Sequence, residues 1–105
     1  MENNRLTFDF KNGELRVVLH GEINHLSAAA MREAIDEKIQ ELRPQNLVLD
    51  LADAPFIDSS GLGLIMGHYQ RMQELGGTLT VANPSAGHQK IFKAAGLNKL
   101  IKIKK

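Results

Sequence analysis

The sequence contains no cysteine and no tryptophan, and the lack of cysteine excludes whole classes of chemistry. Without cysteine there is no disulfide, no thiolate nucleophile and no zinc site with sulfur ligands. Long hydrophobic runs are missing too, because no apolar stretch approaches the ~18 residues of a membrane-spanning helix. Residues 1–5 lack the apolar core of a secretory signal peptide. We therefore expect a cytoplasmic protein that does not associate with membranes.

An excess of charge of one sign is also lacking. Thirteen Lys and Arg residues stand against twelve Asp and Glu residues, which gives a net charge of +1. This balance predicts no general attraction to nucleic acid. The four lysines near the end, Lys99, Lys102, Lys104 and Lys105, are typical of a solvated basic terminus. Because 105 residues with 43% hydrophobic content suffice for one core, we expect a monomeric single domain over residues 1–105.

The pattern of apolar residues predicts strands in the first half of the chain and again near its end. Residues 6–10 alternate between apolar and polar, and residues 15–20 form a second β-prone run, so the two segments are expected to pair as a hairpin. Residues 46–51 are almost entirely apolar, as in a central strand covered on both faces. Residues 78–82 predict a further strand, and residues 100–103 are compatible with a short edge strand.

Three segments between these strands have the periodicity of helices. The first has Ser27 as its expected N-cap and ends at Arg43, because the residue before Pro44 disfavours helical geometry. The second ends at Gly76, and the third runs from Ser85 to Gly96. The expected buried stripes are Ala28, Met31, Ile35, Ile39 and Leu42, then Leu62, Ile65, Met66, Tyr69, Met72 and Leu75, then Ile91, Phe92 and Ala95.

Together these elements predict an α/β fold with the order β-β-α-β-α-β-α. Strands that alternate with helices indicate parallel pairs, and the opening hairpin adds an antiparallel pair. The expected architecture is a mixed sheet of four to five strands with helices packed against it.

Residues 56–63, with the sequence FIDSSGLG, are the most informative segment. They join a buried strand to the start of a helix, where ligand and regulatory sites of α/β sheets gather. Asp58 is expected to cap this helix, and Ser59 then falls in its first turn, where free amides and the helix dipole favour an anion. A phosphoryl group on Ser59 would add a charge of about −1.5 to −2 there. The same residues also suit a helix cap with no further role, and the pattern alone leaves both interpretations open.

Three glycines lie early in the same helix, at Gly61, Gly63 and Gly67. Each costs up to ~1 kcal/mol relative to alanine inside a helix, so we expect another backbone to approach closely, from within the fold or from a partner. Leu64 lies off the apolar stripe of this helix. It is either an exposed anchor for a partner or buried beneath the first helix or the connector at Asn24.

Residues 21–25 and 58–63 resemble the corresponding motifs of the STAS-domain anti-sigma factor antagonists of spore-forming bacteria. Residues 47–51, the pair Gly76 and Gly77, and residues 91–97 fit the same family, so the resemblance covers nearly the whole chain. It implies a STAS fold and a small non-enzymatic protein of transcription regulation, in sporulation or the stress response.

The resemblance also implies a phosphorylation cycle. In the family, the serine after the aspartate, here Ser59, accepts a phosphoryl group from an anti-sigma factor that is itself a serine kinase. The unphosphorylated form binds this anti-sigma factor and frees the sigma factor, and a PP2C-type phosphatase resets the cycle. The expected contact surface comprises Glu22, Asn24, His25, Asp58, Ser60, Gly61, Gly63 and Leu64. Members of the family often have aspartate where this chain has Asn24, which leaves partner choice open.

Other functions are less well supported by the sequence. Gly61 and Gly63 do not complete a dinucleotide-binding fingerprint, because Met66 occupies the position of the third glycine. The nucleophile elbow of serine hydrolases and the phosphate-binding P-loop are both absent. The four histidines, His20, His25, His68 and His88, show no metal-binding spacing, so we expect ordinary surface or partly buried side chains, with no metal and no cofactor. The alternative that remains is a STAS adaptor subunit of a transport or stress-sensing assembly, without a phosphorylation cycle.

Overall fold

The N-terminal hairpin forms as the sequence predicts. The structure, a computed structural model, describes residues 5–105. Our expectation that residues 1–5 are not a signal peptide therefore falls almost entirely outside the described residues. Strand β1 (Leu6–Lys11) pairs antiparallel with β2 (Glu14–Leu19). Asn12 and Gly13 join the two strands with φ angles of 52° and 80°, the left-handed geometry that two-residue hairpins favour.

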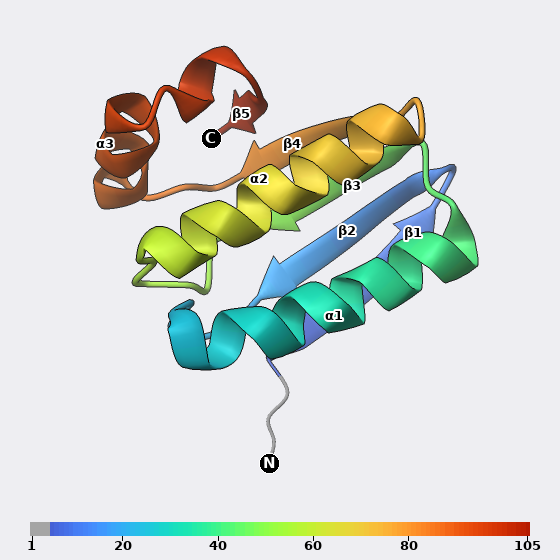
Figure 1. Ribbon diagram of the computed structural model, residues 1–105, viewed down its shortest axis with the longest axis horizontal. Helices are drawn as coiled ribbons and strands as arrows, with labels where there is room; N and C mark the ends of the chain where they lie inside the picture. The colour runs from blue at the N-terminus through green and yellow to red at the C-terminus, as the bar shows by residue number, and fades with distance from the viewer. Residues whose placement is uncertain (1–4) are drawn as a thin grey trace.

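The rest of the chain alternates between helices and parallel strands (Figure 1). The elements are α1 (His25–Leu42), β3 (Asn46–Asp50), α2 (Ser59–Glu74), β4 (Thr78–Ala82), α3 (Ala86–Ala94), a short 3₁₀ helix (Leu97–Lys99) and β5 (Lys102–Lys104). The strands form one five-stranded sheet in the order β1-β2-β3-β4-β5, with β2 to β5 parallel. The predicted α/β order is confirmed. The last strand begins later than expected because the 3₁₀ helix precedes it.

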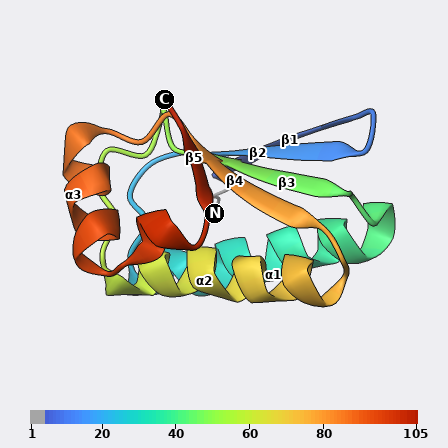
Figure 2. The same ribbon diagram turned by 90° about the horizontal axis from the view of Figure 1, so that it is seen from above.

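One face of the sheet carries the core. Leu15, Leu47 and Leu79 lie side by side on neighbouring strands, and all three are buried. Helices α1 and α2 cover this face, while α3 lies at the end of the sheet (Figure 2). Among residues 5–105, no helix combines the length and the apolar character needed to cross a bilayer.

Helix α1 begins earlier than the sequence suggested. Asn24, rather than Ser27, is the N-cap, and its side chain accepts hydrogen bonds from the amides of Leu26 and Ser27. Ser27 instead completes a capping box, because its hydroxyl accepts a hydrogen bond from the Asn24 amide. The helix ends at Leu42 as expected, and Arg43 follows in the left-handed conformation with φ 48°.

Helix α2 is rotated relative to the stripe that the sequence predicted. Leu62, Met66 and Tyr69 are only half-buried, and Leu75 is exposed. The residues that α2 buries are Gly61, Leu64, Ile65, His68 and Met72. This rotation arises because α2 packs against α1 as well as against the sheet, so its inner face is wider than one apolar stripe.

Helix α3 also departs from its predicted stripe. It buries Phe92 and His88, whereas Ile91 and Ala95 are exposed. The cause is that α3 lies beyond the end of the strands, where few other elements of the fold lie against it. His68 and His88 are both fully buried, which corrects the expectation of surface or partly buried histidines.

His68 occupies an unusual place between α1 and α2. Its side chain is 1% exposed, and neither ring nitrogen has a hydrogen-bond partner within residues 5–105. Burial lowers the pKa of His68 from 6.5 to about 4, and the nearby charges of Arg32 and Arg71 act in the same direction. The carboxylate of Asp36, 3.4 Å from Nδ1, opposes this shift only in part.

We predict that the protein loses stability as pH falls from 7 to 5. The folded state keeps His68 neutral while the unfolded chain takes up a proton near its ordinary pKa, so stability is full above that pKa and declines toward the folded pKa of about 4. The expected loss of unfolding free energy from this residue is about 2 kcal/mol. Denaturant titrations at both pH values measure it. His68→Leu should flatten the pH dependence, whereas His25→Gln, a change at an exposed histidine, should leave it intact. An equal pH dependence in His68→Leu and wild type would contradict the assignment.

Candidate functional site

Two loops pair with each other beside the starts of α1 and α2. The Gly21 amide donates to the Asp53 carbonyl at 2.9 Å, and the Ile23 amide donates to the Phe56 carbonyl at 3.0 Å. The Asp58 amide in turn donates to the Ile23 carbonyl at 3.1 Å. These bonds extend the parallel arrangement of β2 and β3 beyond the strands and hold the two loops in one register.

The loop pairing places two helix N-termini side by side (Figure 1). Ile23 and Ile57 form an isolated parallel bridge, and both side chains are buried. The next residue in each loop is a helix cap, Asn24 for α1 and Asp58 for α2. Because both helices present their positive dipole ends at this place, the surface between them favours negative charge.

Ser59 is the first residue of α2, and its side chain is exposed. The Asp58 carboxylate accepts hydrogen bonds from the amides of Ser60 at 2.8 Å and Gly61 at 3.3 Å. Asp58 therefore caps the helix as predicted. It also occupies amides that we expected to be free for an added anion. A phosphoryl group on Ser59 would lie next to this carboxylate and project toward solvent.

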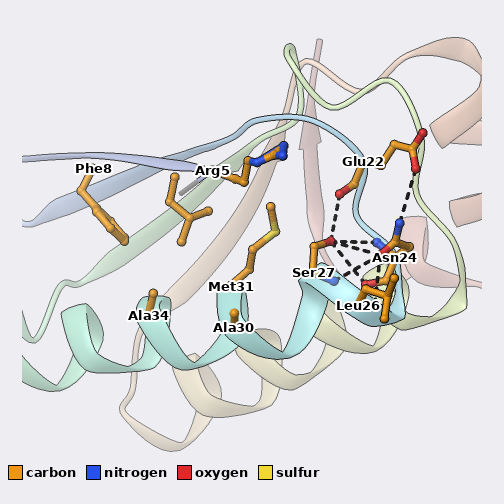
Figure 3. A pocket seen from close by; sticks show the side chains of 10 residues that line it. Arg5, Phe8, Glu22, Asn24, Leu26, Ser27, Ala30, Met31 and Ala34 are labelled. Atoms are coloured by element: carbon orange, nitrogen blue, oxygen red, sulfur yellow. Dashed lines mark hydrogen bonds between the residues drawn. The ribbon is translucent and has the colours of Figure 1, made fainter. Parts of the chain in front are cut away.

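Asn24 and its neighbours form the other half of the site (Figure 3). Asn24 Oδ1 accepts hydrogen bonds from the backbone amides of Leu26 at 2.9 Å and Ser27 at 3.1 Å. The side-chain nitrogen of Asn24, Nδ2, donates to Glu22 Oε1 at 3.4 Å. Glu22 and His25 are exposed. Since aspartate caps helices as well as asparagine does, either residue at position 24 can start α1 in the same way.

The three glycines of α2 differ in their surroundings. A Cβ atom on Gly61 would lie 2.2 Å from Ile57 Cγ1 and 3.0 Å from Ile23 Cγ2, so Gly61 lets the helix pack directly on the paired loops. A Cβ on Gly67 would meet Arg32 Nη2 at 3.0 Å, whereas one on Gly63 would have nothing within 4 Å. The close approach that we predicted is therefore made by side chains rather than by another backbone. Gly61, which we expected in the contact surface, is buried in the structure.

The place of Leu64 in the predicted contact surface changes once its burial is known. Leu64 is 1% exposed, so the hypothesis that it is an exposed anchor is wrong and the alternative of burial is correct. The exposed apolar side chains beside the site are Leu26, at 80% exposure, and Phe56, at 51%. The periodicity of the sequence gave no signal for either residue, because Leu26 lies in the first turn of α1 away from its apolar stripe, and Phe56 lies in the irregular loop before α2.

His20 ties the site to the N-terminal hairpin. Its Nδ1 donates to Asp53 Oδ2 at 2.5 Å, because a carboxylate can only accept, and its Nε2 is hydrogen-bonded to the Thr7 hydroxyl at 2.8 Å. Asp53 belongs to the loop that leads to Asp58, so this chain of hydrogen bonds steadies the loop from the side of β1. Across the described part of the chain, no cluster of three His, Asp or Glu side chains is arranged to hold a metal ion.

Comparison with known proteins identifies relatives over nearly the whole chain. The sequence profile of the STAS domain matches residues 6–105. An anti-sigma F factor antagonist from Paenibacillus polymyxa is 33% identical over 101 residues, which cover 96% of this chain and 86% of the relative. An anti-sigma-B factor antagonist from Bacillus subtilis is 32% identical over 102 residues, which cover 93% of this chain and 90% of the relative.

A solved structure has the same fold. It is that of the anti-sigma factor antagonist SpoIIAA in its unphosphorylated form, which superposes with a TM-score of 0.81 at 23% sequence identity. The match covers 93% of this chain and 86% of that chain.

The contrast between Gly61 and Gly63 gives a matched pair of substitutions. Gly61→Ala should destabilise the fold by about 1–3 kcal/mol, because the added methyl group overlaps Ile57 in a packed region. Gly63→Ala should raise stability by about 0.5–1 kcal/mol, because alanine is the better helix former and the site has room. Chemical denaturation measures both changes. Equal effects of the two substitutions would show that Gly61 does not pack as described.

Proposed function

Because the chain belongs to the STAS domain family, we propose that it acts as an anti-sigma factor antagonist. Its unphosphorylated form binds an anti-sigma factor that is itself a serine kinase, and this binding releases the sigma factor. Phosphorylation of Ser59 ends the binding, and a PP2C-type phosphatase restores the active form. The protein acts in the cytoplasm as a single domain over residues 1–105, and it has no catalytic activity of its own.

One observation carries the assignment of Ser59. Ser59 is an exposed residue at the first position of α2, directly after the Asp58 cap. A kinase can therefore reach the hydroxyl without unfolding the helix, and the positive end of the helix dipole compensates part of the added charge. The neighbouring Ser60 is half-buried, so the same argument does not extend to it.

The contact surface that we propose surrounds Ser59 on both helix starts. It consists of Glu22, Asn24, His25, Asp58, Ser60 and Gly63, together with the exposed apolar side chains of Leu26 and Phe56. Large apolar side chains in the centre of an interface commonly supply most of its binding energy, and polar residues surround them. Gly63 suits this surface because it has no side chain, so a partner can approach the backbone of α2 closely at this position.

Phosphorylation acts on this surface through charge rather than through a change of fold. The phosphoryl group on Ser59, with a charge of about −1.5 to −2, must be desolvated or paired when a partner covers it. Asp58 already contributes a negative charge there, which adds to the cost of burial. Asn24 removes the further negative charge that an aspartate would bring, so the phosphorylated state meets less repulsion in this chain.

We predict that Ser59 is the only residue that an anti-sigma factor kinase phosphorylates. Incubation with the kinase and ATP should add one phosphoryl group to wild type and to Ser60→Ala, and none to Ser59→Ala. Intact mass and peptide mapping measure this. Since both substitutions replace a serine in the same helical turn, Ser60→Ala controls for effects on the fold. Absence of any phosphorylation in wild type would instead favour a STAS adaptor without a phosphorylation cycle.

We also predict that phosphorylation weakens binding to the anti-sigma factor by about thirtyfold or more, which corresponds to ~2 kcal/mol. The reason is that the new charge lies in the centre of the contact surface. Calorimetric titration of the anti-sigma factor with both forms measures the difference, and near-identical circular dichroism of the two forms should confirm that the fold is kept. Equal affinity of the two forms would refute the switch.

A further inference from the structure

The charges of this chain are distributed unevenly along the sequence, although they nearly cancel overall. Residues 75–105 hold six lysines and no Asp or Glu, whereas residues 1–74 hold seven basic and twelve acidic side chains. The net charges of the two parts are therefore +6 and −5. A local excess of this size creates a field that attracts acidic groups. The six lysines are Lys90, Lys93, Lys99, Lys102, Lys104 and Lys105.

The fold gathers these lysines on one side of the molecule, on α3, the 3₁₀ helix and β5 (Figure 1). All six residues are exposed. The ion pairs of the described residues involve other basic side chains, namely Arg16, His20, Lys38 and His68. Within residues 5–105, no carboxylate therefore neutralises any of the six lysines.

Part of this charge lies on the face of the sheet that α1 and α2 leave uncovered. Arg16, Val48 and Thr80 each follow a buried leucine on β2, β3 and β4, so their side chains point away from the two helices. Lys102 lies beside Thr80 on the same face. Within residues 5–105, no helix lies across this side of the sheet (Figure 2).

This uncovered face is hollowed. A trough of about 720 Å³ lies over β3 and β4, where the side chains of Val48, Thr80 and Ala82 are short. Arg16 on β2 and Lys102 on β5 line its two margins. Three strand spacings of ~4.8 Å separate these margins, so they are about 14 Å apart, which leaves room for one segment of protein chain.

The two margins differ in the charge that they offer. Arg16 Nη2 donates to Asp50 Oδ2 at 2.7 Å, so these two side chains neutralise each other. At the opposite margin, Lys102, Lys104 and Lys105 line the trough without an acidic partner among the described residues. The trough therefore combines short side chains on its floor with positive charge along β5.

We propose that this trough binds an acidic segment of a partner protein. Carboxylates of the segment pair with the lysines of β5, and its remaining side chains lie on the floor of the trough. The surface around Ser59 lies at the start of α2, on the other side of the sheet (Figure 2). Both surfaces can therefore be occupied at the same time, and binding in the trough does not depend on a phosphorylation cycle.

A lipid bilayer or a nucleic acid suits this face less well. Each presents negative charge over an area much larger than the trough. Asp9 lies beside Arg16, and Glu14 begins β2 on the same face of the sheet, so a large polyanion would also meet carboxylates. A segment of protein can place its acidic side chains against the lysines of β5 alone.

Fluorescence anisotropy of the full chain with a short labelled peptide, in which glutamate alternates with threonine, tests the proposal at low ionic strength. Wild type should bind this peptide, and a peptide with glutamine in place of glutamate should bind at least about tenfold more weakly. The double variant K102E/K104E should lose at least about tenfold in affinity as well.

A matched control separates the trough from a diffuse attraction by charge. The double variant K90E/K93E changes the net charge by the same amount on α3, outside the lining of the trough, and should lose less than about threefold because of screening. Equal losses in K90E/K93E and K102E/K104E would overturn the docking site.

Two further variants test the place of binding. Thr80→Tyr fills the floor without a change of charge and should weaken peptide binding at least about tenfold, while tyrosine keeps the strand stable. Chemical denaturation checks its fold. Ser59→Asp should bind the peptide as wild type does. A wild type that does not bind, a loss of binding in Ser59→Asp, or tighter binding of phosphatidylglycerol vesicles or a DNA duplex than of the peptide would overturn the proposal.

Discussion

The pairing of two irregular loops holds the functional end of this molecule together. The backbone bonds of Ile23 to Phe56 and Asp58 place the residues that follow, Asn24 and Asp58, beside each other. Because each of these residues caps a helix, their position determines where α1 and α2 begin and in which direction both dipoles point. Gly61 belongs to the same arrangement, since only a residue without a Cβ lets α2 lie directly on the buried pair.

This construction suits a protein that changes its binding without changing its shape. The serine at the start of α2 is exposed, whereas the side chains beneath it are buried and packed. A charge added to Ser59 is therefore felt mainly by whatever docks on the surface. The hydrogen bonds from His20 to Thr7 and Asp53 steady the same loop from the side of the hairpin, so the site is held on two sides.

Local patterns in the sequence predicted most elements but not how they face each other. The stripe predicted for α2 was displaced because Leu64 and His68 are buried against α1, a contact between segments far apart in the chain. The N-cap of α1 was misplaced because Ser27 and Asn24 are both good caps, and the choice depended on where the loop pairing begins. Leu64 was assigned to the contact surface because the sequence pattern did not reveal this packing of α2 against α1.

By itself, the sequence determined the order of strands and helices, the cap at Asp58 and the exposed serine that follows it. These features depend on residues within a few positions of one another, through alternation, helical periodicity and side-chain hydrogen bonds to nearby amides. Only the tertiary structure decided which side chains surround the serine and which strand edge stays open. Leu26 and Phe56 lie beside the site, and within residues 5–105 no strand pairs with the outer side of β1, because helix rotation and strand order arise from packing between distant segments.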